Sequence, residues 1–438
     1  MKQAAQRIFR RTLAAIDIPA ALARKLARDG SRIHVGEGSA AEDFIDFRDY
    51  GEIIAIAFGK ASFAMAEGLS AILPPEFRAD GILVVPSPPP RNLPGWVTFV
   101  GGHPVPNAQS FDAGRTILDR LSLCDERTLI FFLISGGGSA LVEQPLDPSV
   151  TLADFQQLNA ALVTCGAPIE EINIVRKHLS ATKGGRLAAA APRSMKLTYA
   201  VSDVPQGHES ALASGPTLPD PTTVADCERI AKNYGLLQKF PASIHSVFEH
   251  HRLRETPKEG DPAFARARFH LLLGEHELLH AAHHACEAEG FACVCDTSAD
   301  NWPLEKAADH LLALVESRKR ANPGRAVAVL ADGEVLSPVQ GTGIGGRDSA
   351  FVLACVPKIA GKGITVLSAG TDGIDGNSPA AGAVADGQSM ALARAAGLDP
   401  ADFLRRSDAH NFFARLGDAI VTGPTGNNLR DLRILLAE

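Results

Sequence analysis

A short run of apolar, mostly β-branched residues recurs along the chain, and each run ends at a glycine or small polar residue before a helical pattern. The runs cover residues 53–58, 129–134, 197–201, 270–273, 326–330 and 364–368. Continuous apolar runs of this length that alternate with helices are typical of parallel strands buried on both faces. We therefore predict an α/β fold. Ligands of such folds collect at the carboxyl ends of the strands, where the glycines and polar residues fall.

Chain length and one charged segment set the expected domain organisation. The chain has 438 residues, which exceeds one ordinary core, so two or three domains are expected. The charge-rich stretch 250–267 interrupts the strand–helix rhythm, and we place the boundary at its start. The expected domains are therefore 1–249 and 250–438.

The overall charge and the cysteines limit the classes of partner and compartment. The formal net charge of −7 is spread along the chain, so neither nucleic acid nor an anionic membrane is expected as partner. No apolar run approaches about 18 residues, so no membrane span is expected. Seven scattered cysteines without a CxxC are typical of reduced intracellular thiols. The Arg-rich N-terminus lacks a secretory core and fits a first surface helix, although a mitochondrial presequence shares these features. We expect a cytoplasmic protein.

The most specific local motif is the run Ser135, Gly136, Gly137, Gly138 and Ser139, which follows the apolar run 129–134. Three glycines after a buried strand let successive N–H groups point outward, and such a nest suits phosphate oxygens. A purely structural turn is the alternative, but two glycines usually suffice for one.

Two cationic side chains stand at similar positions. Lys60 follows the run 53–58 at the start of a helix, where it could meet a phosphate or simply be solvated. Arg347 directly follows a GxGxxG match at 341–346 and precedes a helix that is expected over 348–356. That match lacks the long preceding strand and the acidic residue of a dinucleotide fingerprint, and no Walker A motif occurs in the chain.

Other motifs are less specific. The segment 171–186 concentrates basic residues, including Lys177 and Lys183, and a solvated basic face explains it as well as a ligand site does. Two glycine-rich turns lie at residues 372–377 and 423–428, and the second is predicted to enter a helix. Their carboxylates and backbone N–H groups suit a site for magnesium and phosphate, but ordinary turns have the same composition. His276-Glu277-Leu278-Leu279-His280 matches the HExxH pattern of zinc proteases, but it begins too soon after a strand to favour that function.

Taken together, these segments resemble the glycerate kinases of the MOFRL type over nearly the whole chain. The resemblance rests on residues 57–62, 101–107, 133–145, 171–188, 202–220, 341–348, 368–387 and 411–434. It implies a larger N-terminal Rossmann-like three-layer domain, a smaller C-terminal α/β domain and an active site in the cleft between them. It also implies ATP and Mg²⁺ as cofactors, D-glycerate as the small-molecule substrate and 2-phosphoglycerate as product. A homodimer stays open as an oligomeric state.

The resemblance also assigns roles to individual residues. Lys60, Arg347 and Asp203 match catalytic positions, and Asp203 or Asp372 is expected to hold Mg²⁺ or to take the hydroxyl proton. Cofactor binding is expected of the loop 135–139 with Lys177, Thr425 and Asn427. Substrate binding is expected of Lys183, Ser214, Asp372 and Asn377. Phosphoryl transfer requires positioning and charge neutralisation more than covalent chemistry, which these groups could supply.

The chain departs from the family pattern at three places. Gln206-Gly207-His208-Glu209 stands where paired aspartates are usual, and Asp348 and Ala350 replace Asn and Glu. The family's Gly-Gly-Glu-Thr-Thr stretch reads Asp332-Gly333-Glu334-Val335-Leu336. These changes lie in ligand-facing loops and leave the hydroxy acid, and even turnover, open. An NAD(P)H-dependent hydroxypyruvate reductase and a non-catalytic ligand-binding relative are the alternatives.

Overall fold

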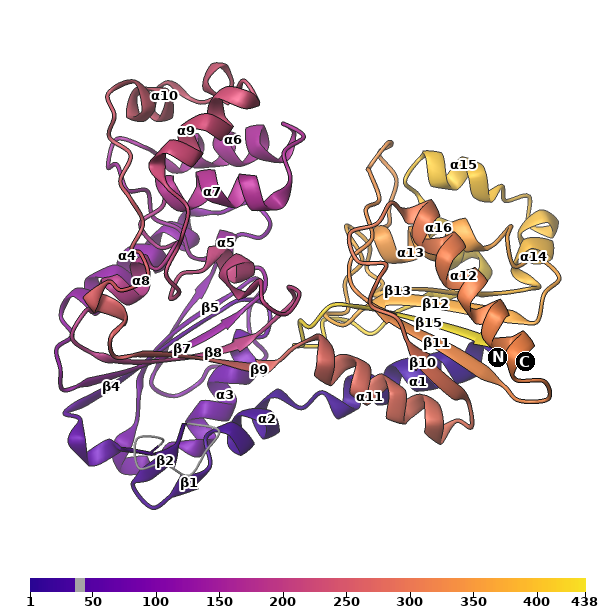
Figure 1. Ribbon diagram of the computed structural model, residues 1–438, viewed down its shortest axis with the longest axis horizontal. Helices are drawn as coiled ribbons and strands as arrows, with labels where there is room; N and C mark the ends of the chain where they lie inside the picture. Colours follow the sequence, from indigo (N-terminus) through magenta and orange to yellow (C-terminus); the bar gives the residue numbers. More distant parts are fainter. Residues whose placement is uncertain (36–43) are drawn as a thin grey trace. The chain divides into compact units, whose positions relative to one another are not determined.

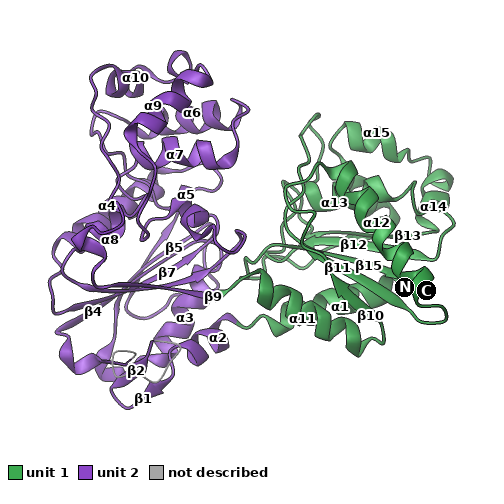
Figure 2. Ribbon diagram, in the orientation of Figure 1, with its two compact units in different colours: residues 1–17, 273–438 green, residues 18–272 purple. Residues whose placement is uncertain are grey.

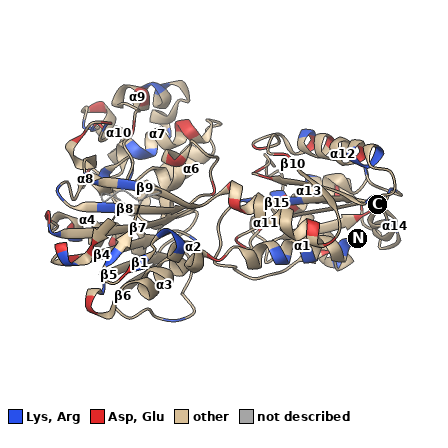
Figure 3. Ribbon diagram, turned by 60° about the horizontal axis from the view of Figure 1, so that its bottom comes forward, with Lys and Arg blue, Asp and Glu red and all other residues tan. Residues whose placement is uncertain are grey.

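The computed structural model describes residues 1–35 and 44–438 and divides into two compact units. Unit 1 comprises residues 1–17 and 273–438, and unit 2 comprises residues 18–272 (Figure 2). These limits differ from the expected domains 1–249 and 250–438, because the strand β9 (Ala267–Leu273) joins the sheet of unit 2 and the first helix packs in unit 1. Lys, Arg, Asp and Glu are interspersed over both units (Figure 3). Within the described ranges no helix is long and apolar enough to cross a membrane.

The main sheet of unit 2 has the strand order β6-β5-β4-β7-β8-β9. Its first five strands are β4 (Glu52–Phe58), β5 (Asp80–Val85), β6 (Trp96–Val100), β7 (Thr128–Ser135) and β8 (Met195–Val201), and these pair in parallel. The central strands β4, β7 and β8 are buried almost along their whole length, as their continuous apolar runs predict. A small antiparallel sheet of β1 (Arg28–Asp29), β2 (Arg32–His34) and β3 (Phe44–Asp46) lies near the start of the unit.

Helices cover this sheet and form a second cluster (Figure 1). The helices α3 (Ser62–Ile72) and α4 (Ala108–Ser122) pack against strands of the sheet, and α2 (Ile18–Lys25) packs against α3. Two short helices, α5 (Gly138–Leu141) and α8 (Arg186–Ala189), contribute Leu141 and Leu187 to the apolar core that α4 shares with the sheet. The cluster comprises α6 (Leu152–Val163), α7 (Ile169–Leu179), α9 (Val224–Asn233) and α10 (Ala242–Glu249), which share an apolar core of their own. The short 3-10 turn η4 (Glu209–Ser214) contacts α5, α7 and β7. The α/β prediction is thus confirmed.

The sheet of unit 1 has the order β10-β11-β15-β12-β13-β14. Its strands are β10 (Ala292–Cys295), β11 (Val327–Asp332), β12 (Ile364–Gly370), β13 (Gly382–Asp386), β14 (Ala419–Ile420) and β15 (Asp431–Ala437). Only β10 and β11 pair in parallel; β15 is antiparallel to both of its neighbours, and so is β12. The prediction of parallel strands was therefore wrong for the pairs that β12, β13 and β15 form, because a buried central strand has the same apolar run in either direction.

Two layers of helices enclose this sheet (Figure 1). On one face lie α1 (Lys2–Ala15) and α11 (Glu275–Ala288), and on the other lie α12 (Leu304–Ala321) and α13 (Arg347–Cys355). Of the remaining helices, α15 (Pro400–Arg405) and α16 (Ala409–Leu416) pack against α13, and α14 (Ser389–Ala395) packs against α16. Residues 423–428 lead into β15, so the helix expected after them was wrong.

Candidate functional site

Four loops of unit 2 lie at the carboxyl ends of its parallel strands. Gly59 and Lys60 follow β4, residues 101–107 follow β6, residues 136–139 follow β7, and Ser202 and Asp203 follow β8. Carboxyl ends of parallel strands meet at one edge of a sheet, which is where ligands bind in α/β folds. This edge therefore brings the predicted loop 135–139 together with Lys60.

The loops after β4 and β7 interlock through their backbones. The Lys60 amide donates to the Gly136 carbonyl at 3.0 Å, and the Ala61 amide donates to Ser135 Oγ at 2.9 Å. A Cβ on Gly59, whose φ is 121°, would lie 2.2 Å from Ser135 Oγ, so only glycine permits this approach. Ser135 is buried and holds the two loops in register rather than lying at a rim.

Gly137 lies close to side chains from two neighbouring loops. Its φ is 81°, and a Cβ there would lie 3.2 Å from His103 Cδ2, 3.3 Å from His103 Nε2 and 3.3 Å from Lys60 Cγ. The absence of a Cβ at Gly137 thus lets the His103 ring and the Lys60 side chain both pack closely beside this loop. His103 was missed from the sequence as a site residue, although the segment 101–107 that contains it follows β6 as the other loops follow their strands.

A polar chain extends from Ser139 into the helical cluster. Ser139 Oγ and Ser214 Oγ are 2.9 Å apart, Ser214 Oγ donates to Asn173 Oδ1 at 3.4 Å, and Arg176 Nη1 donates to the same oxygen at 3.4 Å. Ser214 is buried and has a φ of 63°, following Ala213 at 49°. Two successive non-glycine residues in the left-handed region are costly, and such strain concentrates at functional sites. Ser214 therefore belongs with the loop 135–139.

Lys177 and Lys183 form buried ion pairs. Lys177 Nζ lies 3.1 Å from Asp220 Oδ1, and Lys183 Nζ lies 2.6 Å from Glu143 Oε2. Burial lowers the pKa of Lys183 although Glu143 opposes that shift. The solvated basic face that seemed equally acceptable for 171–186 is therefore wrong at these two positions, and both ammonium groups have structural partners.

Asp203 is half-buried and follows β8 in a turn closed by the Val204 amide, which donates to Ser202 Oγ at 3.2 Å. The departing residues 206–208 are exposed just beyond it. The Gly207 amide donates to Glu209 Oε1 at 2.8 Å, and the φ of Gly207 is 85°. An aspartate at position 207 would be strained at this φ. The departure from the family's paired aspartates therefore involves the backbone conformation of the turn as well as its side chains.

In unit 1, Arg347 is the first residue of α13 and is held by two carboxylates. Its Nη1 and Nη2 donate to Glu334 at 2.7 and 2.5 Å, and its Nε and Nη2 donate to Asp431 at 2.5 and 3.3 Å. Burial alone would lower the pKa of Arg347, but Asp431 and Glu334 raise it above its ordinary value. The guanidinium is thus fixed in place and permanently charged.

The GxGxxG match serves the packing of this arginine's helix. A Cβ on Gly346 would lie 2.1 Å from Asp375 Oδ1, and Asp375 accepts hydrogen bonds from the Asp348 and Ser349 amides at 3.0 and 2.9 Å. The carboxylate therefore caps α13. Burial raises the pKa of Asp348, whose carboxyl accepts a hydrogen bond from Ser368 Oγ.

Asp372 lies beside the carboxylate that holds Arg347. A Cβ on Gly370 would lie 3.1 Å from Asp372 Oδ1 and 3.5 Å from Asp431 Oδ1, so the two carboxylates flank this glycine. Mg²⁺ in phosphate-transfer sites is usually bound by one or two carboxylates, with water and phosphate as the other ligands. The described residues contain no group of three or more His, Cys, Asp or Glu placed to hold a metal. The pair fits an ion that takes most of its ligands from a phosphate.

The other predicted residues of unit 1 hold its loops. Asn377 Oδ1 accepts from the Gly345 amide at 2.8 Å, and its Nδ2 donates to the Gly343 carbonyl at 3.1 Å. Thr425 Oγ1 donates to the Thr371 carbonyl at 2.5 Å and accepts from the amide of buried Asn427 at 3.1 Å. The structure thus brings Asp372, Thr425 and Asn427 to the turn after β12, whereas Asn377 braces the loop before α13.

Comparisons with known proteins identify relatives over nearly the whole chain. The model described as "Domain of unknown function (DUF4147)" matches residues 4–249, and that of the "MOFRL family" matches residues 327–431. A D-glycerate 2-kinase of Thermotoga maritima is 32% identical over 385 residues, covering 87% of this chain and 90% of the relative. A protein of Agrobacterium vitis with a provisional hydroxypyruvate reductase name is 35% identical over 408 residues, covering 89% and 88%.

A solved structure has the same two-domain architecture. The crystal structure of a glycerate kinase from Thermotoga maritima matches with a TM-score of 0.81 at 30% identity, covering 100% of this chain and 99% of that one. The chain therefore belongs to the MOFRL-type glycerate kinase family, with a DUF4147 domain in its N-terminal half and a MOFRL domain in its C-terminal half.

Proposed function

We propose that this protein transfers the terminal phosphate of ATP to D-glycerate and releases 2-phosphoglycerate and ADP. The observation that carries the proposal is the close approach of the Lys60 and His103 side chains to Gly137 of the triple-glycine loop. The names of several relatives, D-glycerate 2-kinase and glycerate kinase, support the substrate.

The groups of unit 2 suit phosphate binding. Lys60 supplies a compact positive charge, and the backbone N–H groups of residues 136–139 supply fixed dipoles. Phosphoryl transfer gains its rate from positioning and charge neutralisation, so these groups need not react covalently. Lys177 and Lys183 are left out of direct contact in this proposal, because buried carboxylates already hold them.

The groups of unit 1 suit a second set of phosphate oxygens. The guanidinium of Arg347 has five N–H groups. Four of them donate to Glu334 and Asp431, so, counting bonds to the described residues, one N–H on Nη1 could donate to a phosphate oxygen. Asp372, flanked by Asp431, would hold Mg²⁺, which when bound neutralises the charge of the ATP phosphates. Asp203 would accept the proton of the attacking hydroxyl.

A screen for ATP consumption tests the proposal. Purified protein is incubated with ATP, with and without Mg²⁺, over D-glycerate, L-glycerate and larger hydroxy acids, and the product is identified by phosphorus NMR. We expect Mg²⁺-dependent turnover of D-glycerate with the phosphate on the 2-hydroxyl. Oxidation of NADH with hydroxypyruvate and no ATP turnover would instead show the reductase. ATP binding without turnover of any acid would show a ligand-binding relative.

A further inference from the structure

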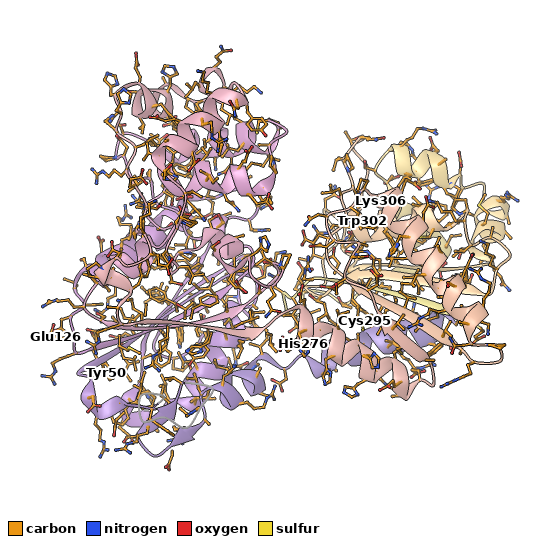
Figure 4. All side chains as sticks on the ribbon, viewed as in Figure 1. Tyr50, Glu126, His276, Cys295, Trp302 and Lys306 are labelled. Carbon is orange, nitrogen blue, oxygen red and sulfur yellow. The ribbon has the colours of Figure 1, made fainter. Side chains whose placement is uncertain are left out.

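The histidine-rich helix α11 carries a motif that phosphate transfer does not use. His276, His280 and His284 recur every fourth residue, and all three side chains are exposed, while Leu278, Leu279, Ala282, Ala285 and Cys286 face the core. Residues four apart lie on one face of a helix. Figure 4 labels His276, which begins this row.

The HExxH match at the start of this helix has a structural explanation. Glu277 Oε2 accepts a hydrogen bond from the Gly274 amide at 2.8 Å, so its carboxylate caps the helix and is not directed at a metal between the histidines. The rings of His276 and His280 are nearly parallel, at 9°, with centroids 6.1 Å apart. The stacked rings of His276 and His280 therefore differ in arrangement from the next pair, His280 and His284.

His280 and His284 converge. Their Nε2 atoms are 3.1 Å apart, and their rings are nearly perpendicular, at 87°, with centroids 4.4 Å apart. Imidazole nitrogens bind transition metals at about 2.0–2.1 Å, so two such bonds to nitrogens at this separation enclose an angle of about 98°. That angle lies between square-planar and tetrahedral coordination. We propose that His280 and His284 form a chelating site for one divalent transition-metal ion, of the Cu²⁺, Ni²⁺ and Zn²⁺ class.

A neighbouring carboxylate favours the nitrogen that the site needs. Glu287 Oε2 lies 3.8 Å from His284 Nδ1, and its other oxygen lies 3.4 Å from Nε2 of the adjacent His283. A carboxylate on the Nδ1 side of a ligating histidine attracts the proton there and leaves Nε2 unprotonated for the metal. Since no third His, Cys, Asp or Glu completes a metal cluster among the described residues, water would fill the remaining positions.

The site requires the folded helix. The two nitrogens converge because both residues lie on one turn of α11, and unfolding separates them. Metal binding therefore stabilises the folded protein, by an amount that grows with the logarithm of the metal concentration once this exceeds Kd. The site is independent of ATP and of the proposed kinase activity.

Calorimetric titration of the metal-free full-length protein with Ni²⁺ tests the site. We expect one site in the wild type and binding weakened at least about tenfold in both His280→Ala and His284→Ala, since even partners outside the ligand shell cost that much when removed. Ni²⁺ should also raise the Tm of the wild type and leave that of His280→Ala unchanged. The control is His245→Ala, because His245 also lies on an exposed helix face with a glutamate four residues on.

Other variants separate this pair from its neighbours. His276→Ala and Cys295→Ser should leave Ni²⁺ binding as in the wild type; the Cys295 thiol lies 3.9 Å from His283 Nδ1 and is the nearby competing ligand. Loss of binding in His276→Ala with retention in His284→Ala would place the ion on the other half of the row and overturn the proposal. So would a wild type that does not bind Ni²⁺ more tightly than His280→Ala does.

Discussion

Lys60 is the residue on which the phosphate-transfer chemistry depends most. Replacing Lys60 by Ala removes the charged end of a side chain whose Cγ lies beside Gly137, and it leaves the backbone bond from residue 60 to Gly136 in place. We expect kcat to fall at least about 100-fold, equivalent to about 3 kcal/mol of barrier, with an unchanged circular dichroism spectrum. Lys232→Ala, on the exposed surface of α9, is the control. A kcat within twofold of wild type would remove Lys60 from the mechanism.

His103 is the second side chain beside Gly137. It was found from the structure and not from the family motifs, so a variant at this position tests the structural assignment of the site. Its ring lies beside Gly137, as the Lys60 side chain does, so we expect it to donate a hydrogen bond to a bound phosphate. His103→Ala should raise KM for ATP about tenfold, the worth of one hydrogen bond to a charged group, while kcat changes less. His103→Gln, which retains a donor, should recover part of the loss. Equal KM values in all three proteins would show that His103 only fills space.

At the scale of elements, the loop between β7 and α5 needs a glycine at position 137 for two separate reasons. An alanine there would be strained at a φ of 81°, and its Cβ would also crowd the side chains of His103 and Lys60. Gly166 provides a matched control, because its φ is 82° and a Cβ there would meet nothing within 4 Å. Both alanine variants should lose about 1–2 kcal/mol of unfolding free energy. Only Gly137→Ala should lose turnover, measured in the same ATP assay.

The segment after α5 and the turn between α7 and α8 are joined by the buried pair of Glu143 and Lys183. Lys183→Met leaves a buried carboxylate without its cation, and we expect a loss of about 3–5 kcal/mol of unfolding free energy. The double variant Glu143→Leu, Lys183→Met should recover much of that loss in urea denaturation. If the single and double variants were equally unstable, the pair would not be the cause.

At the scale of the whole molecule, Asp332 links stability to pH. Burial raises the pKa of Asp332 to about 6, although Arg430 Nη1, 2.9 Å from its Oδ2, opposes the shift. In the unfolded chain the pKa is about 3.9. The folded state therefore holds the proton more tightly, and this contribution to stability is complete below about pH 4 and is lost as the pH rises through about 6.

The Asp332→Asn variant should lack this dependence. Between pH 4 and pH 7.5, the wild type should lose about 2–3 kcal/mol of unfolding free energy relative to the variant. In a Trp96→Phe background, the fluorescence of Trp302, which packs on the unit 1 core with Lys306 Nζ 3.6 Å from its ring centroid (Figure 4), reports the unfolding of that unit. The exposed Asp80 provides the control as Asp80→Asn. A pH dependence equal in wild type and Asp332→Asn would exclude this carboxyl.

The sequence by itself determined the α/β class, the positions of the buried strands and the glycine loops at their ends, because these depend on local apolar runs and on backbone conformations that only glycine adopts easily. Residues 53–58 and 129–134 became β4 and β7, and the loop that follows β7 lies beside Lys60. The kinase family followed from motifs whose order along the chain is itself sequence information.

Only the tertiary structure decided which partners those elements found. The antiparallel position of β15 between β11 and β12, the packing of α1 with unit 1 and the buried partners of Lys177 and Lys183 all join residues far apart in the chain. So does the approach of His103 to Gly137. A buried strand has the same apolar run in either direction, and a lysine has the same local sequence whether it meets water or a distant carboxylate. The local sequence pattern does not determine such long-range contacts; the packing of the whole chain does.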